Sequence, residues 1–297
     1  MKNFSVLLLA LFLSISSAML LTACSDDSDG GEQLPPKNPI EIPEELAQKL
    51  HTIYAQSSIE PQTVTSVHQL AILTSVCASR DGYGPISVTP CRLNGEEITL
   101  VTLGGTQQVE GQATTMKENQ LASFGKPNDY LTAVTKLFQN GTIPASKPVL
   151  VTGISLGGMI AQQILGVGEV LESHTLKGII TFGSPITLPL NRHDVKVVRF
   201  ADVNDKVPQL GEMLLRGGMV LDGQLTKDEQ LKKMAALDVE EKIARQSKYT
   251  DMIETHALSY IEDACWQDVD FWGDPAKKNT LELTSKMIFY PAPKLTE

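Results

Sequence analysis

The stretch that determines the fold of this chain reads VLVTGISLGG and runs from Val149 to Gly158. Its first part is a short apolar run of the kind that forms a buried strand, and the residues after Ser155 are typical of a helix. Gly153 and Gly157 stand two positions before and two positions after this serine. A strand that turns sharply into a helix needs glycine at both positions, because side chains there would collide. The pattern therefore predicts a strand, a strained turn at Ser155, and a helix.

Alternating strands and helices are predicted on both sides of this stretch. Short apolar runs predict strands at 98–102, 149–152, 176–182 and 195–200. Helical spacing and capping residues predict helices at 43–55, 64–77, 128–138 and 156–165, and from a Thr226–Glu229 capping box to about 246. Such alternation is typical of a mostly parallel sheet that helices cover on both faces.

Ser155 is the candidate nucleophile, since the turn holds its hydroxyl clear of the backbone. A nucleophilic serine needs a histidine base and an acid that orients it. In an α/β-hydrolase fold the chain order is serine, acid, histidine. Of five histidines, only His256 follows both the serine and a loop with a suitable acid. We therefore expect an α/β-hydrolase fold in the α/β class.

The orienting acid should lie in the loop after a strand. Asp202 and Asp205 both follow the predicted strand 195–200, and Asp205 is the preferred candidate while Asp202 is its competitor. Asp251 and Glu254 are close to His256 in sequence, but helical neighbours seldom orient a base correctly.

The oxyanion hole needs two hydrogen-bond donors. The amide of Leu156 opens the helix after the serine, where the helix dipole favours negative charge. A second donor should come from the loop after an earlier strand, and the amide of Thr106, with its hydroxyl, fits this place. A simple glycine turn at 104–105 would also account for the loop.

Four segments together resemble the lipase class 3 family, that of the fungal-type triacylglycerol lipases. They are Leu103–Thr106, Val151–Gly158, Thr181–Pro185 and Asn204–Pro208, and His256 with Tyr260 is similar to the family's terminal histidine segment. The resemblance implies Asp205 rather than Asp202 as the acid, and it implies hydrolysis of lipid esters.

The sequence departs from this family at three places. Ile154 stands where the family usually has histidine, and Leu103-Gly104 stands where it often has an aromatic residue and arginine. The stretch 107–128, where the family carries its lid, is polar and has few large apolar residues. This polarity argues against activity at triglyceride interfaces.

The N-terminus predicts export and lipidation. Lys2 precedes a mostly apolar run from Val6 to Leu21 that is too short to span a membrane comfortably. The following Thr22-Ala23-Cys24 completes a stretch that resembles a bacterial lipobox, so we expect residues 1–23 to be a signal peptide. Cys24 would carry the lipid, 24–39 would form a flexible tether, and 40–297 the hydrolase domain. Because Ser25 rather than aspartate follows Cys24, we expect the outer membrane if the host has two membranes.

The other cysteines are Cys77, Cys91 and Cys265. In an exported protein one disulfide is expected, and Cys77 with Cys91 is favoured because the segment between them looks irregular. Three buried thiols are the alternative.

The composition of the chain excludes some classes of binding partner. The chain has 297 residues, of which 42% are hydrophobic and 20% charged, with a net charge of −10. It has no basic run, so we expect no nucleic-acid partner, and no cluster has metal-ligand spacing, so we expect no metal or cofactor.

The sequence predicts a membrane-anchored serine hydrolase of acyl-lipid esters, with phospholipase or small-ester esterase as alternatives. A surface lipoprotein that uses this fold to bind a partner is the alternative from another class.

Overall fold

The computed structural model describes residues 43–76, 84–107, 111–123, 125–187, 195–209, 241–262, 264–273 and 278–295. The predicted signal peptide, Cys24 and the tether lie outside these residues. Within the described part, no helix is long and apolar enough to cross a membrane.

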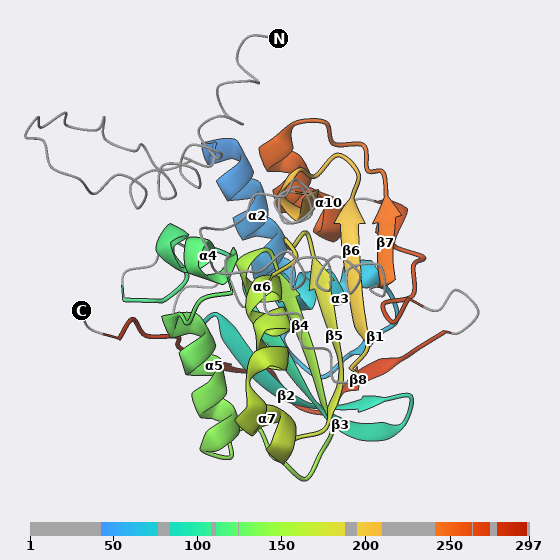
Figure 1. The fold of residues 1–297 in the computed structure, drawn as a ribbon. Coiled ribbons are helices and arrows are strands. Elements are labelled where there is room, and N and C mark those ends of the chain that lie inside the picture. Colours follow the sequence, from blue (N-terminus) through green and yellow to red (C-terminus); the bar gives the residue numbers. More distant parts are fainter. Residues whose placement is uncertain are drawn as a thin grey trace, which may run out of the picture.

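A nine-stranded sheet forms the centre of the described structure (Figure 1). Its order is β1-β8-β2-β3-β4-β5-β6-β7, with β9 paired to β2. The strands are β1 Thr63–Val64, β2 Ile86–Leu93, β3 Glu96–Leu103, β4 Val149–Ile154, β5 Leu176–Phe182, β6 Val197–Asp202, β7 Glu241–Arg245, β8 Leu281–Leu283 and β9 Ile288–Tyr290. Strands β3 to β7 pair in parallel, and the remaining pairs are antiparallel. This is the α/β-hydrolase fold that the sequence predicts.

Helices cover both faces of the sheet (Figure 1). One apolar core lies between the sheet and α5 Asp129–Gln139, α6 Leu156–Gln163 and α7 Gly168–Ser173. The other lies between the sheet and α2 Glu44–Gln56, α3 Val67–Val76 and α10 Met252–Glu262. A further short helix, α4 Met116–Ser123, packs against α6. Short 3-10 turns follow α6 at Ile164–Gly166 and α10 at Ala264–Trp266.

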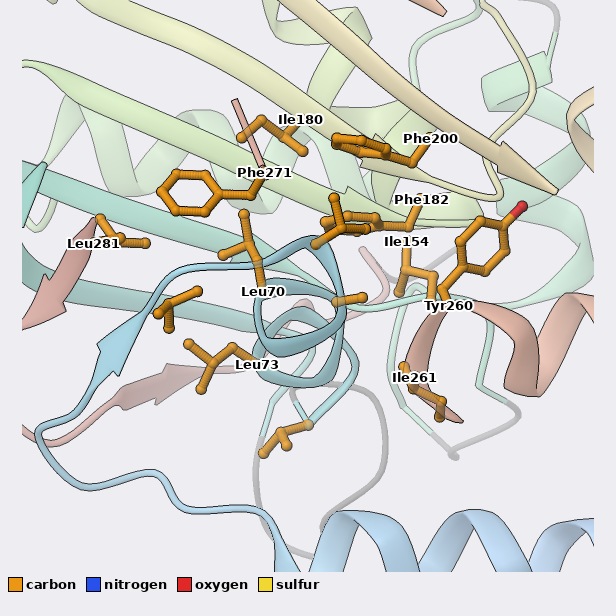
Figure 2. Packing of buried hydrophobic residues seen from close by; sticks show 14 of the residues in the cluster. Leu70, Leu73, Ile154, Ile180, Phe182, Phe200, Tyr260, Ile261, Phe271 and Leu281 are labelled. Atoms are coloured by element: carbon orange, nitrogen blue, oxygen red, sulfur yellow. The ribbon is translucent and has the colours of Figure 1, made fainter. Parts of the chain in front are cut away.

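The parallel strands are apolar on both faces, which explains why they read as continuous hydrophobic runs. Figure 2 shows Ile180, Phe182 and Phe200 on neighbouring strands beside Leu70 of α3 and Tyr260 of α10. The rings of Phe182 and Phe200 stack with centroids 5.7 Å apart. This apolar packing between the strands and helices α3 and α10 fixes the strand ends that carry the polar residues of the site.

The predicted strands all occur, and β6 extends two residues beyond its predicted end, to Asp202. Asn128 caps α5 as predicted, because its side chain accepts a hydrogen bond from the Leu131 amide at 2.8 Å. The predicted helix from Thr226 lies largely outside the described residues. Its expected end is wrong, however, because Glu241–Arg245 form β7 at the edge of the sheet.

Residues 86–90, which directly precede Cys91, do not belong to the irregular loop that the sequence suggested. Residues 86–93 form β2, which pairs with β3 across a tight Asn94-Gly95 turn at positive φ. Cys91 therefore lies inside the sheet, and its side chain points into the core and is 2% exposed.

Cys91 is a free thiol, which contradicts the expected disulfide with Cys77. Its Sγ donates to the Thr89 carbonyl at 3.4 Å. Burial raises the pKa of this thiol to about 12, so it stays protonated at neutral pH. Cys77 lies outside the described residues.

Candidate active site

Ser155 lies at the turn between β4 and α6 with a backbone that few residues other than glycine adopt. Its φ is 50° and its ψ is −119°. Such a conformation costs about 1–3 kcal/mol and persists only where the surroundings enforce it. Here the amide of Ser155 donates to the carbonyl of Phe182 on β5 at 3.0 Å. The turn is therefore held by the neighbouring strand.

Gly153 and Gly157 allow the turn to be this tight. A Cβ on Gly153 would lie 2.3 Å from the carbonyl oxygen of Gly157, and a Cβ on Gly157 would lie 2.1 Å from that of Leu103. Real side chains do not approach backbone atoms this closely. Any residue larger than glycine would push α6 away from β3 and move the serine between them.

His256 reaches Ser155 from α10. The carboxylate of Asp251 accepts the amides of Ile253 and Glu254 at 2.9 and 3.0 Å, and so caps the start of this helix. One turn later, Nε2 of His256 lies 2.9 Å from the hydroxyl oxygen of Ser155. Its other ring nitrogen, Nδ1, lies 2.9 Å from Oδ2 of Asp205.

Asp205 is fully buried in the loop after β6 and accepts three hydrogen bonds. Its Oδ1 accepts the amide of Val207 at 2.9 Å. Its Oδ2 accepts both His256 Nδ1 and the hydroxyl of Tyr260, each at 2.9 Å. A carboxylate in this position requires the proton of the neutral imidazole to sit on Nδ1, which leaves Nε2 free to accept the serine proton.

Asp202, the competing acid, is placed differently. It is the last residue of β6, and its Oδ1 accepts the amide of Asn204 at 2.8 Å. Its own amide donates to the hydroxyl oxygen of Tyr260 at 2.9 Å. Within the described structure it has no hydrogen bond to His256. The structure therefore places Asp205, and not Asp202, beside the imidazole.

The neighbours of His256 change its acid–base behaviour. Burial of the imidazole opposes a positive charge, but the charge of Asp205 and the hydrogen bond to it outweigh burial and raise the pKa of His256 above its ordinary value. Burial, followed by the charge of Asp205, also raises the pKa of Tyr260 well above its ordinary range. Tyr260 therefore stays a neutral hydrogen-bond donor to the carboxylate.

The loop after β3 forms the opposite side of the site. Gly105 lies close to the serine, since a Cβ on it would be 3.4 Å from the Cβ of Ser155. The next residue is Thr106, whose hydroxyl oxygen accepts Nδ2 of Asn119 from α4 at 2.5 Å. Leu156 is the first residue of α6, so its amide has no acceptor inside the helix. The start of α6 and the loop after β3 therefore both lie next to Ser155.

The arrangement can transfer a proton from a serine to a histidine whose charge an acid would stabilise. The amide at the start of α6 and the loop that carries Thr106 lie beside the serine, and hydrogen-bond donors at such positions are what acyl transfer needs. In the described part of the chain, no three His, Cys, Asp or Glu side chains are arranged to hold a metal ion.

Sequence reasoning did not assign roles to several residues that the structure brings to the site. Tyr260 follows His256 by four residues, so it shares a face of α10, and this spacing could have pointed to it. Gly183 and Ser184 lie inside one of the segments that resemble lipase class 3. A Cβ on Gly183, which has a φ of +56°, would lie 3.1 Å from Oδ2 of Asp205. For Asn119 the sequence carries no signal.

Comparison with known proteins supports the α/β-hydrolase assignment. Residues 108–252 match the model of a family described as PGAP1-like alpha/beta domain. This segment contains Ser155 and Asp205 and ends before His256. No curated protein matches the chain.

One solved structure is also similar, the crystal structure of EstE5 soaked with p-nitrophenyl butyrate. It shares 13% identity with this chain, and the match covers 68% of this chain and 87% of EstE5 with a TM-score of 0.24. A match this distant says nothing about the function of this chain. Together with the strand order described above, the family match supports an α/β-hydrolase fold for this chain. The match does not extend to the lipase class 3 family.

Proposed function

We propose that this protein is a serine carboxylic-ester hydrolase that acts on acyl lipids, with Ser155, His256 and Asp205 as its catalytic triad. The observation that carries the proposal is a continuous chain of hydrogen bonds. It runs from the hydroxyl of Ser155 through both ring nitrogens of His256 to a buried carboxylate, with both distances at 2.9 Å. The side chain of His256 is 24% exposed and that of Asp205 is not, so the base faces the solvent side while the acid is sealed.

The mechanism follows from this geometry. Ser155 attacks the ester carbonyl while His256 takes its proton at Nε2, and the buried carboxylate of Asp205 stabilises the imidazolium. The amides of Leu156 and Thr106 bind the oxyanion, and the hydroxyl of Thr106 adds a third donor. His256 then protonates the departing alcohol. In the second half of the reaction, His256 takes a proton from water, which attacks the acyl group on Ser155. His256 then returns the proton to Ser155, and the free acid leaves.

Three observations support acyl lipids as the substrates. The segments that resemble lipase class 3 include both the serine turn and the acid loop. The match to a PGAP1-like alpha/beta domain covers the same two regions. In addition, helix α2, which follows the proposed tether, is joined to α10 by an ion pair between Lys49 and Glu262 at 2.7 Å. The proposed lipid-anchored tether would therefore join the domain on the side of the helix that carries His256.

A hydrolysis screen tests the substrate class. Wild-type protein is compared on triglyceride, phospholipid and short p-nitrophenyl esters beside Ser155→Ala, with Ser285→Ala, between β8 and β9, as the control. We expect hydrolysis of long-chain acyl lipids and a loss of about six orders of magnitude in kcat for Ser155→Ala, as for other serine hydrolases. Activity confined to short esters would assign a small-ester esterase. Residual activity of a few per cent in Ser155→Ala would reject the nucleophile.

We also propose that Cys24 carries the lipid anchor. The motivation is the lipobox-like Leu21-Thr22-Ala23-Cys24 before a polar stretch. Cells grown with a clickable fatty acid should label the wild type and not Cys24→Ser. An unlabelled wild type would reject the anchor.

Recovery with outer-membrane fractions on a sucrose gradient would support the location expected from Ser25, and recovery with inner-membrane fractions would contradict it.

A further inference from the structure

The peptide bond between Ser155 and Leu156 is held from outside its own helix. The carbonyl oxygen of Ser155 accepts the amides of Gly158 at 3.1 Å and Met159 at 3.2 Å, which both belong to α6. It also accepts the hydroxyl of Ser184, at the shorter distance of 2.9 Å. Ser184 follows the end of β5 and lies on the neighbouring strand connection.

The same segment holds the other side of the serine. The amide of Ser155 donates to the carbonyl of Phe182 at 3.0 Å, two residues before Ser184. The backbone of Ser155 is therefore bonded to residues 182–184 through both its N–H and its C=O. Helix α6 could shift together with its own amides, whereas the bonds to residues 182–184 tie the strained turn to the sheet.

Fixing this carbonyl also fixes the Leu156 amide. In a planar trans peptide the C=O and the N–H point in opposite directions. The direction of the Leu156 N–H is therefore set by the hydrogen bonds on the carbonyl of Ser155. A hydrogen bond to the carbonyl also polarises the peptide unit, which makes its N–H a stronger donor.

Ser184 is itself firmly placed. It is 2% exposed, and its carbonyl accepts Nη2 of Arg199 at 3.4 Å. It packs so closely on α6 that a Cβ on Gly158 would lie 2.6 Å from its hydroxyl oxygen. The hydroxyl has a second acceptor, the carbonyl of Pro185, at 3.3 Å. The shorter distance to Ser155 identifies that carbonyl as the main acceptor.

We propose that Ser184 is a positioning residue for the oxyanion hole, which aims and polarises the Leu156 amide through the carbonyl of Ser155. The proposal rests on the proposed serine-hydrolase function. It explains why a hydroxyl, rather than an apolar side chain, lies buried between β5 and the start of α6. Because Ser184 is only 2% exposed, it offers no surface to a substrate, so it acts on the transition state and not on substrate binding.

Ser184→Ala tests this role, and Thr181→Val is its matched control. Thr181 lies on β5, three residues before Ser184, and its buried hydroxyl has no hydrogen-bond partner in the described part of the structure. Each variant deletes one buried hydroxyl, next to α6 in Ser184→Ala and within the sheet in Thr181→Val. We expect kcat to fall about tenfold in Ser184→Ala with KM within about twofold, because only a transition-state contact weakens. Thr181→Val should keep the wild-type kcat.

A boronic acid that mimics the tetrahedral intermediate provides the second measurement. Its affinity for Ser184→Ala should fall by the same factor as kcat. The affinity for an ester analogue that resembles the substrate and forms no tetrahedral adduct should stay unchanged. Ser184→Cys keeps the size of the side chain but donates weakly, so its kcat should lie between those of the wild type and Ser184→Ala. This variant also serves if Ser184→Ala does not fold.

The outcomes separate this inference from the proposed function. If a fluorophosphonate does not label the wild type, the serine-hydrolase function is rejected and this inference with it. If it labels the wild type and Ser184→Ala at the same rate, only the role of Ser184 is rejected. An equal loss of kcat in Thr181→Val, or a loss of boronic-acid affinity no greater than that of the ester analogue, would also overturn it.

Discussion

The two sides of the candidate site are built in different ways. On the acid side, Asp205 and Tyr260 are fully buried and joined by hydrogen bonds from β6 and α10. On the oxyanion side, Thr106 is partly exposed and held through its side chain by Asn119 of a short helix. Met116 on that helix is 45% exposed. The acid is thus built into the core, whereas the oxyanion loop lies at the surface.

This difference separates two kinds of contribution to catalysis. Residues on the acid side set the charge and orientation of His256, so changes there should alter both the turnover and its pH dependence. In the proposed mechanism, residues on the oxyanion side stabilise charge that exists only in the transition state. Changes there should lower kcat and leave the pH dependence unchanged.

The largest expected effect on this comparison comes from the acid. Asp205→Asn should lower kcat by about four orders of magnitude, the loss known for the equivalent change in another serine hydrolase, because the amide favours the wrong imidazole tautomer. Asp202→Asn should cost far less, since that carboxylate has no contact with His256 in the described structure. Steady-state kinetics of both variants provides the test. Equal or reversed effects would mean that the wrong carboxylate has been chosen.

Thr106→Val should reduce kcat by up to about a hundredfold, near the loss seen when one oxyanion donor is removed elsewhere. Thr106→Ser keeps the hydroxyl and should retain most of the activity. Asn119→Ala should lower kcat in the wild type and have no further effect in Thr106→Val, because it acts through the hydroxyl. Additive losses in this double-mutant cycle would show that Asn119 does not act through Thr106.

Tyr260→Phe should have a smaller effect, on the order of a few-fold to tenfold in kcat, because the carboxylate keeps two of its three donors. Without the tyrosine hydroxyl, Oδ2 of Asp205 carries more negative charge, so the pKa of His256 should rise further. Ser259→Ala deletes a buried hydroxyl on the same helix that has no partner in the described structure. If the pH–rate profile shifts equally in Tyr260→Phe and Ser259→Ala, Tyr260 contributes only to packing.

The smallest effect concerns the wild-type pH profile. His256 must be neutral to accept the serine proton, and its pKa is raised by Asp205. Activity should therefore fall as the pH decreases through a midpoint above about 6.5, the ordinary imidazole value. In Asp205→Asn this midpoint should move to lower pH. A wild-type midpoint below the ordinary value would contradict the account of the ion pair.

Much of the fold could be predicted because the parallel strands are buried on both faces. That burial makes β4 and β5 stand out as apolar runs, and the glycines around Ser155 mark the turn between them. β2 was missed because Pro90 interrupts its pattern. The proline is tolerated because it lies between the residues of β2 that pair with β8 and those that pair with β9.

The candidate site could be predicted only in part. Ser155, His256 and Asp205 carry the signals of chain order and loop position. Cys91 was placed wrongly because its strand was not recognised, and the expected disulfide failed with it. Contacts such as that of Asn119 with Thr106 join residues whose spacing has no period, so only the folded chain reveals them.

The most direct test of the central claim is to identify the residue that a fluorophosphonate modifies. Purified protein is treated with the probe, and the adduct is located by peptide mass spectrometry, with His256→Ala as the control that retains the serine but lacks its base. We expect one adduct on Ser155 in the wild type and much slower labelling in His256→Ala. The absence of an adduct, or an adduct on another serine, would contradict the assignment of Ser155 as the nucleophile.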